Sequence, residues 1–347
     1  MDRRDFTKSL LGTLGLVGSS WSAMNFGFRH NNPRTIKPMR LKKGQKIGLI
    51  CPGSSVSAER LELAKSNVAL LGCEPVVGKN ALAKKGYLAG EDAQRLSDLH
   101  DMFKDRSISA IWCVRGGYGC GRLLPKIDFN LIKKNPKILI GYSDITALTT
   151  SIHMLTGLIT FHGPIAAADF PDYSQILMQE VLFAGKSRIE LNPFPNPAIT
   201  NEPTNIPYTI KSGLARGRLM GGNLSVLASL VGTPWQFNSK NRIVFLEDID
   251  EKPYRIDRLL VQLRQSECFE DINALAYGMF KGCNPEPNDA SLTLQETLKA
   301  QSETLKIPCA YGMPFGHISD QCTLPLGVMA AFDADKRILR IEESAVK

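Results

Sequence analysis

KILIGYSDITAL, residues 137–148, is the stretch of sequence that decides the fold. Its apolar beginning, Ile138–Ile140, predicts a buried strand, and Gly141 permits a sharp turn after it. The apolar residues that follow are spaced as the buried face of a helix. Strand, tight turn, serine and helix form the layout of a nucleophile elbow. Such an elbow would present the Ser143 hydroxyl at the C-terminal edge of a sheet and aim the Asp144 N–H at an oxyanion.

Ser143 also has a simpler interpretation. A serine before a helix is most often an N-cap that satisfies a free backbone N–H. Ile145 stands where the usual Gly-x-Ser-x-Gly pattern has its second glycine, so the stretch is not a plain α/β-hydrolase signature. Taken alone it favours the N-cap, and the remaining chain has to decide between the two.

The composition is that of an ordinary globular protein. The chain has 347 residues, 43% of them hydrophobic and 22% charged, which suffices for two domains or one large one. The formal net charge is +8, but the basic residues are scattered, so no nucleic-acid partner is expected. The eight cysteines contain no Cys-x-x-Cys pair. We therefore expect the cysteines to be small buried hydrophobic residues. We expect neither a metal nor a cofactor.

Residues 1–23 have the pattern of an export signal. Arg3-Arg4-Asp5-Phe6-Thr7-Lys8 precedes the short apolar run Leu10–Val17 and then small residues, an order that resembles twin-arginine signals. The run is too short and too rich in glycine for a stable membrane span. Trp21 makes a poor cleavage site, so retention as an anchor stays open. Residues 24–44 are polar and basic and are interpreted as a linker.

Residues 45–168 alternate between predicted strands and helices and are expected to form the first domain. Strands are expected at Gln45–Ile50 and Ile108–Val114, a strand and turn at Leu158–Pro164, and helices at Ala58–Leu71 and Ala89–Asp105. This alternation predicts an α/β fold with a parallel sheet, in which ligands bind at the C-terminal ends of the strands.

Arg115-Gly116-Gly117-Tyr118-Gly119 follows one of those strands. Its spacing is not Gly-x-Gly-x-x-Gly, so dinucleotide binding is only a minor alternative. A glycine loop also lets backbone N–H groups approach a substrate, and this one could supply a second oxyanion donor.

The second half of the chain begins with a connection rich in Pro, Asn and Asp. We assign residues 169–210 to this connection, with one helix around Ser174–Phe183, and residues 211–347 to a second domain. Within it, Arg216–Ser225 is expected to be a turn leading into a helix. The other expected elements are a strand from Arg242 that ends in an acidic cluster, a helix at Tyr254–Gln265, a strand at Ala274–Phe280 and a hairpin of Ala330–Asp333 with Ile338–Ile341.

Five motifs together resemble the LD-carboxypeptidase family of serine peptidases, which also includes microcin C7 self-immunity peptidases. They are Arg115–Gly119, Gly141–Asp144, Met220-Gly221-Gly222-Asn223-Leu224, Phe245-Leu246-Glu247-Asp248 and Gly316-His317. They occur in the family's order from about residue 45 to the C-terminus. The resemblance implies a Rossmann-like (flavodoxin-like) N-terminal domain with a smaller β-rich α/β C-terminal domain, assembled as a homodimer.

The resemblance also implies a catalytic triad. Ser143 corresponds to the nucleophile, Glu247 to the orienting acid and His317 to the general base. This agrees with the chemistry, because a serine hydroxyl needs a base and the base needs a carboxylate on its far nitrogen. The backbone N–H groups of Asp144 and of Gly116 or Gly117 would then hold the oxyanion.

Several alternatives stay open for these positions. His317 could be a structural histidine, His153 is interpreted as helix surface, and His162 as at most a second layer around the site. Glu247 competes with the acidic residues that follow it, Asp248, Asp250 and Glu251, any of which could pair with Arg255 or Arg258. Arg115, Tyr118 and Asn223 are candidate substrate-binding residues, with Arg115 suited to a free carboxylate.

The function expected from the sequence is an exported serine carboxypeptidase. It would release a terminal D-amino acid, typically D-alanine, from murein tetrapeptides in the periplasm or cell envelope. Two alternatives are hydrolysis of a peptide–nucleotide conjugate, as in the microcin branch, and non-catalytic binding of envelope peptides.

Overall fold

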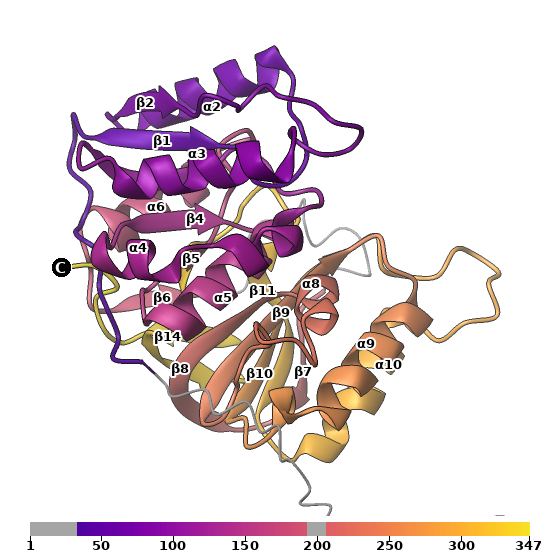
Figure 1. The fold of residues 1–347 in the computed structure, drawn as a ribbon. Helices are drawn as coiled ribbons and strands as arrows, with labels where there is room; N and C mark the ends of the chain where they lie inside the picture. The colour runs from indigo at the N-terminus through magenta and orange to yellow at the C-terminus, as the bar shows by residue number, and fades with distance from the viewer. Residues whose placement is uncertain (1–32, 193–205) are drawn as a thin grey trace, which may run out of the picture.

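The structure is a computed structural model that describes residues 33–192 and 206–347. The predicted export signal therefore lies outside the described residues. Two sheets organise the fold, one above the other in Figure 1. The first has the strand order β12-β5-β4-β3-β1-β2, and every pair is parallel except β5 with β12. Its strands are β1 (Lys46–Ile50), β2 (Glu74–Val77), β3 (Ile108–Cys113), β4 (Ile138–Gly141), β5 (Phe161–His162) and β12 (Leu324–Pro325).

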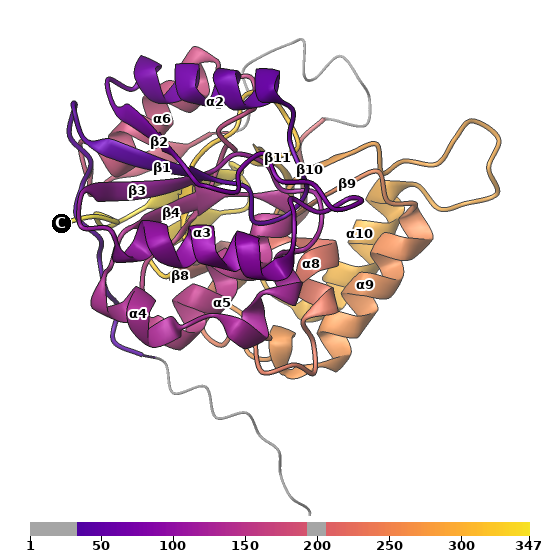
Figure 2. The same cartoon turned by 45° about the horizontal axis from the view of Figure 1, so that its top comes forward.

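Helices cover both faces of this sheet because successive side chains of its buried strands point to opposite sides. Ile111 and Leu139 belong to the core under α3, α4 and α5, and Trp112 and Ile140 belong to the core on the other face, with α2 and α6. Figure 2 shows the two groups of helices on either side of the sheet. The helices are α2 (Ala58–Leu70), α3 (Asp92–Lys104), α4 (Phe129–Lys134), α5 (Thr146–Thr156) and α6 (Asp172–Leu182).

The second sheet has the strand order β6-β14-β13-β8-β9-β10-β11-β7. Strands β8 to β11 are parallel and the outer ones antiparallel. Helices α8, α9 and α10 gather beside the parallel strands (Figure 1). The strands are β6 (Ile189–Leu191), β7 (Tyr208–Lys211), β8 (Leu214–Asn223), β9 (Arg242–Ile249), β10 (Ala274–Lys281), β11 (Cys309–Gly316), β13 (Met329–Asp333) and β14 (Ile338–Ile341). The helices are α8 (Leu224–Ser229), α9 (Pro253–Gln265) and α10 (Leu294–Ser302).

The prediction of a turn over Arg216–Ser225 is wrong, because most of this segment belongs to the ten-residue strand β8. The glycines that suggested a turn serve close packing instead. A Cβ on Gly221 would lie 1.8 Å from the Phe245 carbonyl oxygen, and one on Gly222 would lie 2.5 Å from a Thr146 methyl carbon. Glycine inside a strand marks such close approaches.

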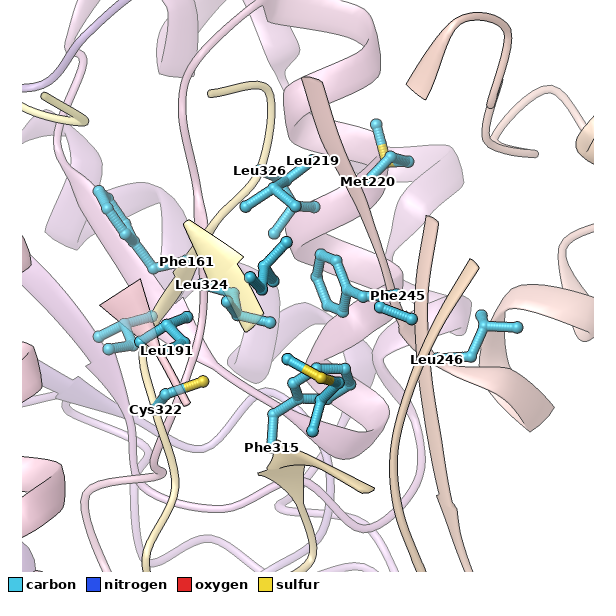
Figure 3. Close-up of a cluster of buried hydrophobic side chains, with 14 of the residues drawn as sticks. Phe161, Leu191, Leu219, Met220, Phe245, Leu246, Phe315, Cys322, Leu324 and Leu326 are labelled. Carbon is cyan, nitrogen blue, oxygen red and sulfur yellow. The ribbon is translucent and has the colours of Figure 1, made fainter. Parts of the chain in front are cut away.

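The two sheets share one continuous core. Strand β12, from the C-terminal part of the chain, pairs with β5 of the first sheet. Figure 3 shows Phe161 and Leu324 from this side near Phe245 and Phe315 of the second sheet. The prediction of a two-domain α/β fold with a parallel sheet is confirmed, and so is the terminal hairpin, in which Ala330 pairs with Ile341.

Other expectations about the chain concern its cysteines, metals and membranes. All eight cysteines are buried and free, as expected for small hydrophobes. Within residues 33–192 and 206–347, no cluster of His, Cys, Asp and Glu is arranged to hold a metal ion. None of the helices in the same ranges has the length and apolar character needed to span a bilayer.

Candidate active site

Ser143 occupies a strained turn at the C-terminal end of β4. Its φ is +62°, in the left-handed region that non-glycine residues rarely adopt. Such a conformation costs on the order of 1–3 kcal/mol and is found where the surrounding structure enforces it, often at active sites. Tyr142, not Ser143, is the N-cap of the short 3-10 helix Ser143–Ile145 that leads into α5, and it makes no side-chain cap bond. The N-cap interpretation of Ser143 is therefore wrong.

The glycine loop after β3 lies directly against this elbow. A Cβ on Gly116 would lie 3.0 Å from the Ser143 Cβ and 3.3 Å from the Asp144 backbone nitrogen. The Asp144 side chain holds the loop by accepting from the Cys120 N–H at 2.9 Å. Asp144 thus has the structural side-chain role expected for it, and its backbone nitrogen lies close to Gly116.

Glu247 and His317 form a pair beside the elbow. Glu247 lies inside β9 and is fully buried, whereas His317 follows the last residue of β11 and keeps 13% of its side chain exposed. The His317 Nδ1 lies 2.7 Å from Glu247 Oε2. The structure thus brings together the acid and the base expected from the sequence.

Burial and the Glu247–His317 interaction shift the pKa of each of these two residues in opposite directions. Burial raises the pKa of Glu247, but the charge and hydrogen bond of His317 outweigh it and leave the pKa below its ordinary value. Burial lowers the pKa of His317, but Glu247 outweighs it and leaves the pKa above the ordinary value. The carboxylate thus stabilises the imidazolium, which is what a base that accepts a serine proton requires.

Two of the acidic residues that competed with Glu247, Asp248 and Glu251, have other partners. Asp248 accepts from the Ser225 hydroxyl at 2.7 Å and from the Asn223 amide at 3.1 Å. Burial, with the charge of Glu247, raises the pKa of Asp248 to about 6. Glu251 pairs with Arg255 at 3.4 Å on the surface.

Tyr142, the residue before Ser143, brings the elbow into contact with His317. The rings of Tyr142 and His317 meet edge to face, with centroids 4.7 Å apart. No hydrogen bond joins Ser143 to His317 across the described parts of the chain. Catalytic hydrogen bonds are often long or poorly aligned before substrate binds, so His317 remains the candidate base.

The three candidate substrate-binding residues differ in solvent exposure and in their hydrogen bonds. Arg115 is exposed and donates to the Ser55 carbonyl at 3.0 Å. Tyr118 is 54% exposed and its ring lies 5.5 Å from that of Tyr87, a neighbour that sequence reasoning missed. Asn223 is buried, and its amide is engaged at both ends because it also caps α8 by accepting from the Val226 N–H.

The two rival histidines are both in the interior. The interpretation of His153 as helix surface is wrong, since it is 6% exposed and its Nδ1 lies 3.0 Å from the Leu158 carbonyl oxygen. Burial and the nearby Arg242 lower its pKa to about 4. His162 is fully buried against the rings of Tyr142 and Phe245, at centroid distances of 6.1 and 5.3 Å. Its position next to the Glu247–His317 pair is not apparent from spacing in the sequence.

Comparison with known proteins identifies the family of this chain and, with it, the class of enzyme, a peptidase. Residues 47–163 match the model of the LD-carboxypeptidase N-terminal domain, and residues 216–332 match that of the LD-carboxypeptidase C-terminal domain. The chain belongs to the LD-carboxypeptidase family, as the resemblance of its five motifs predicted.

Relatives on both branches of the family are similar over most of their length. The probable murein peptide carboxypeptidase of Bacillus subtilis is 38% identical over 88% of this chain and 94% of its own. The murein tetrapeptide carboxypeptidase of Pseudomonas aeruginosa is 30% identical over 84% of this chain and 94% of its own. The microcin C7 self-immunity protein MccF has a similar structure, with a TM-score of 0.80 and 26% identity over 90% of this chain and all of its own.

Proposed function

We propose that this protein is a serine-type LD-carboxypeptidase that releases the terminal D-alanine of murein tetrapeptides. One observation carries the proposal: the strained Ser143, at φ +62°, stands at a sheet edge beside a buried Glu247–His317 pair 2.7 Å apart. The identity to two murein peptide carboxypeptidases supports the substrate class.

Each residue has a role in this mechanism. Ser143 attacks the scissile carbonyl while His317 accepts its proton, and His317 later returns a proton to the leaving amino group of D-alanine. Glu247 orients the imidazole and stabilises its charged form. Water then hydrolyses the acyl-enzyme with His317 as base.

The oxyanion of each tetrahedral intermediate is stabilised by backbone N–H groups. Asp144 supplies one and Gly116 or Gly117 supplies the other. The closeness of Gly116 to the Asp144 nitrogen supports this pairing. Donors of this kind act in a fixed geometry and need no reorganisation when charge develops.

Arg115 and Tyr118 extend the site toward solvent. Arg115 would bind the free α-carboxylate of the terminal residue through its guanidinium. Tyr118 would flank the peptide. The reaction takes place in the periplasm or cell envelope after export through the twin-arginine-type signal, and the protein acts as a homodimer without nucleic acid.

Mass spectrometry of product mixtures tests the substrate. The full-length chain is incubated with L-Ala-D-Glu-diaminopimelate-D-Ala and, separately, with the same peptide ending in L-Ala. The expected result is loss of alanine from the first peptide only. Equal cleavage of both, or of neither, would contradict LD specificity.

A second candidate function follows from the likeness to MccF, which has been crystallised with aspartyl sulfamoyl adenosine. In that case the chain would hydrolyse an amide between an amino acid and a nucleotide-like group. The same assay with an aminoacyl sulfamoyl adenosine distinguishes the two, since each candidate predicts turnover of one substrate and not the other.

A further inference from the structure

Buried polar atoms without partners gather behind the Glu247–His317 pair. Within the described ranges these are Glu247 Oε1, both ring nitrogens of His162, Gln321 Oε1 and Thr323 Oγ1. Buried polar groups are nearly always hydrogen-bonded, to protein or to ordered water. Several such atoms around one spot therefore point to a common ligand.

These atoms come from segments that are in contact. Thr323 precedes the strand residue that pairs with His162, and its Oγ1 lies 3.0 Å from where a Cβ on Gly163 would be. The Gln321 amide donates to the Gly316 carbonyl. A Cβ on Gly316 would lie 3.4 Å from the Glu247 Cβ. The segments that carry these atoms are thus neighbours of Glu247.

His162 is the member with no other assigned role. Its charge state is coupled to both Glu247 and His317, and its ring packs on Tyr142, Phe245 and Phe315. Burial lowers its pKa to about 4, although Glu247 opposes this and His317 adds to it. At neutral pH the ring is therefore uncharged, with one N–H donor and one acceptor nitrogen.

The free oxygen of Glu247 needs a donor. The Asn223 side chain is among the groups that lower the Glu247 pKa, but its Nδ2 donates to Asp248 at 3.1 Å, and Oε1 forms no well-aligned hydrogen bond within the described residues. A buried water usually makes about three hydrogen bonds. A water bound among these segments would donate to Glu247 Oε1 and Gln321 Oε1 and accept from His162 and Thr323.

We propose that His162 is a positioning residue for the reaction, holding Glu247 in place through an ordered buried water. The inference rests on the proposed function, because it assumes that Glu247 orients His317. A carboxylate held at both oxygens keeps the imidazole in the geometry that Ser143 needs. If the water loses its donor, Glu247 is freer to rotate, and proton transfer from Ser143 slows.

Three substitutions distinguish this role from a purely packing role of the His162 ring. His162→Phe keeps a ring against Tyr142, Phe245 and Phe315 but removes both nitrogens. His162→Gln keeps a donor and an acceptor in a smaller volume. Thr323→Val removes one further partner of the water and is nearly isosteric. Thermal unfolding of each full-length variant checks that it folds.

The readout is the rate at which a fluorophosphonate labels Ser143, measured from pH 5 to 9, alongside kcat and KM for the tetrapeptide. We expect His162→Phe to lower the labelling rate and kcat about 10- to 100-fold with little change in KM. Its pH midpoint should fall, because Glu247 holds the imidazolium less well. His162→Gln should recover most of the rate, and Thr323→Val should lose less than His162→Phe.

Different results would overturn the role of His162 and the proposed function of the protein. Equal labelling rates and pH midpoints for wild type and His162→Phe would overturn the role of His162 alone. Labelling of wild type no faster than that of Ser143→Ala would overturn the proposed function and this inference with it. If His162→Phe does not fold, a Thr323→Val rate equal to that of wild type would overturn the proposed water.

Discussion

Gly116 gives the sharpest test of the proposed oxyanion site, because a single methyl group there reaches Ser143, the proposed nucleophile. In Gly116→Ala the new Cβ would lie 3.0 Å from the Ser143 Cβ and 3.3 Å from the Asp144 nitrogen. Carbon atoms in ordinary contact are about 3.5–4.0 Å apart. The elbow must therefore move by about 0.5 Å.

The expected loss of kcat in Gly116→Ala follows from the groups that this methyl displaces. Both the nucleophile and one oxyanion N–H shift relative to the substrate carbonyl. Loss of one oxyanion donor typically lowers kcat about 10²- to 10³-fold, so we expect kcat to fall roughly 100-fold with KM within about threefold of wild type. Overpacking should cost about 1–3 kcal/mol of stability, which leaves the protein folded for assay.

The matched control is Gly121→Ala in the same loop. A Cβ on Gly121 meets nothing within 4 Å, so this variant should keep wild-type kcat. The assay is release of D-alanine from the tetrapeptide, with urea unfolding for stability. Full activity in Gly116→Ala, or an equal loss in both variants, would refute the placement of the oxyanion site.

Three further predictions concern the elbow and the pair. Ser143→Gly and Ser143→Ala should both be inactive, but the glycine variant should be the more stable by up to about 1 kcal/mol, because only glycine relieves the positive φ; equal unfolding midpoints would contradict the strain. Glu247→Gln should lower kcat roughly 10³- to 10⁴-fold, as expected when the carboxylate that fixes the imidazole tautomer is lost; a loss below tenfold would assign the acid elsewhere. Activity requires neutral His317, whose pKa is raised by Glu247, so kcat/KM should rise with pH through a midpoint above 6.5, and a midpoint below that value would contradict the pairing.

The same pair sets a pH window for stability. Glu247 has a lowered pKa, so its contribution is present above its unfolded pKa and is lost as the pH falls through the folded value. His317 has a raised pKa, so its contribution is present below its unfolded pKa and is lost as the pH rises through the folded value. The contribution of the ion pair to stability is therefore greatest between the unfolded-state pKa values of the two groups, about 4.5 and 6.5.

Local patterns in the sequence predict four strands of the first sheet, β1, β3, β4 and β5, and the elbow, but not β2 or β12. The apolar run before Gly141 and the helical spacing after it are short-range signals, and the structure has β4 and α5 there. Glu247 and His317 were identified by their motifs, and the structure brings them within 2.7 Å across 70 residues of chain.

Features that depend on tertiary contact could not be predicted. The glycines of β8 suggested a turn because their reason, the nearness of Phe245 and Thr146, exists only in the fold. The burial of His153 depends on Arg242 and Gly327, both distant in sequence. The pairing of β12 with β5, which brings Thr323 next to His162, is likewise invisible to local periodicity.

The central claim is that Ser143 is the nucleophile of an LD-carboxypeptidase. The most direct measurement is D-alanine release from L-Ala-D-Glu-diaminopimelate-D-Ala by the wild-type chain and by Ser143→Ala, purified in parallel and compared by unfolding midpoint. The account predicts release by the wild type and at least a 10³-fold lower rate for the folded Ser143→Ala chain. Comparable release by both would contradict it.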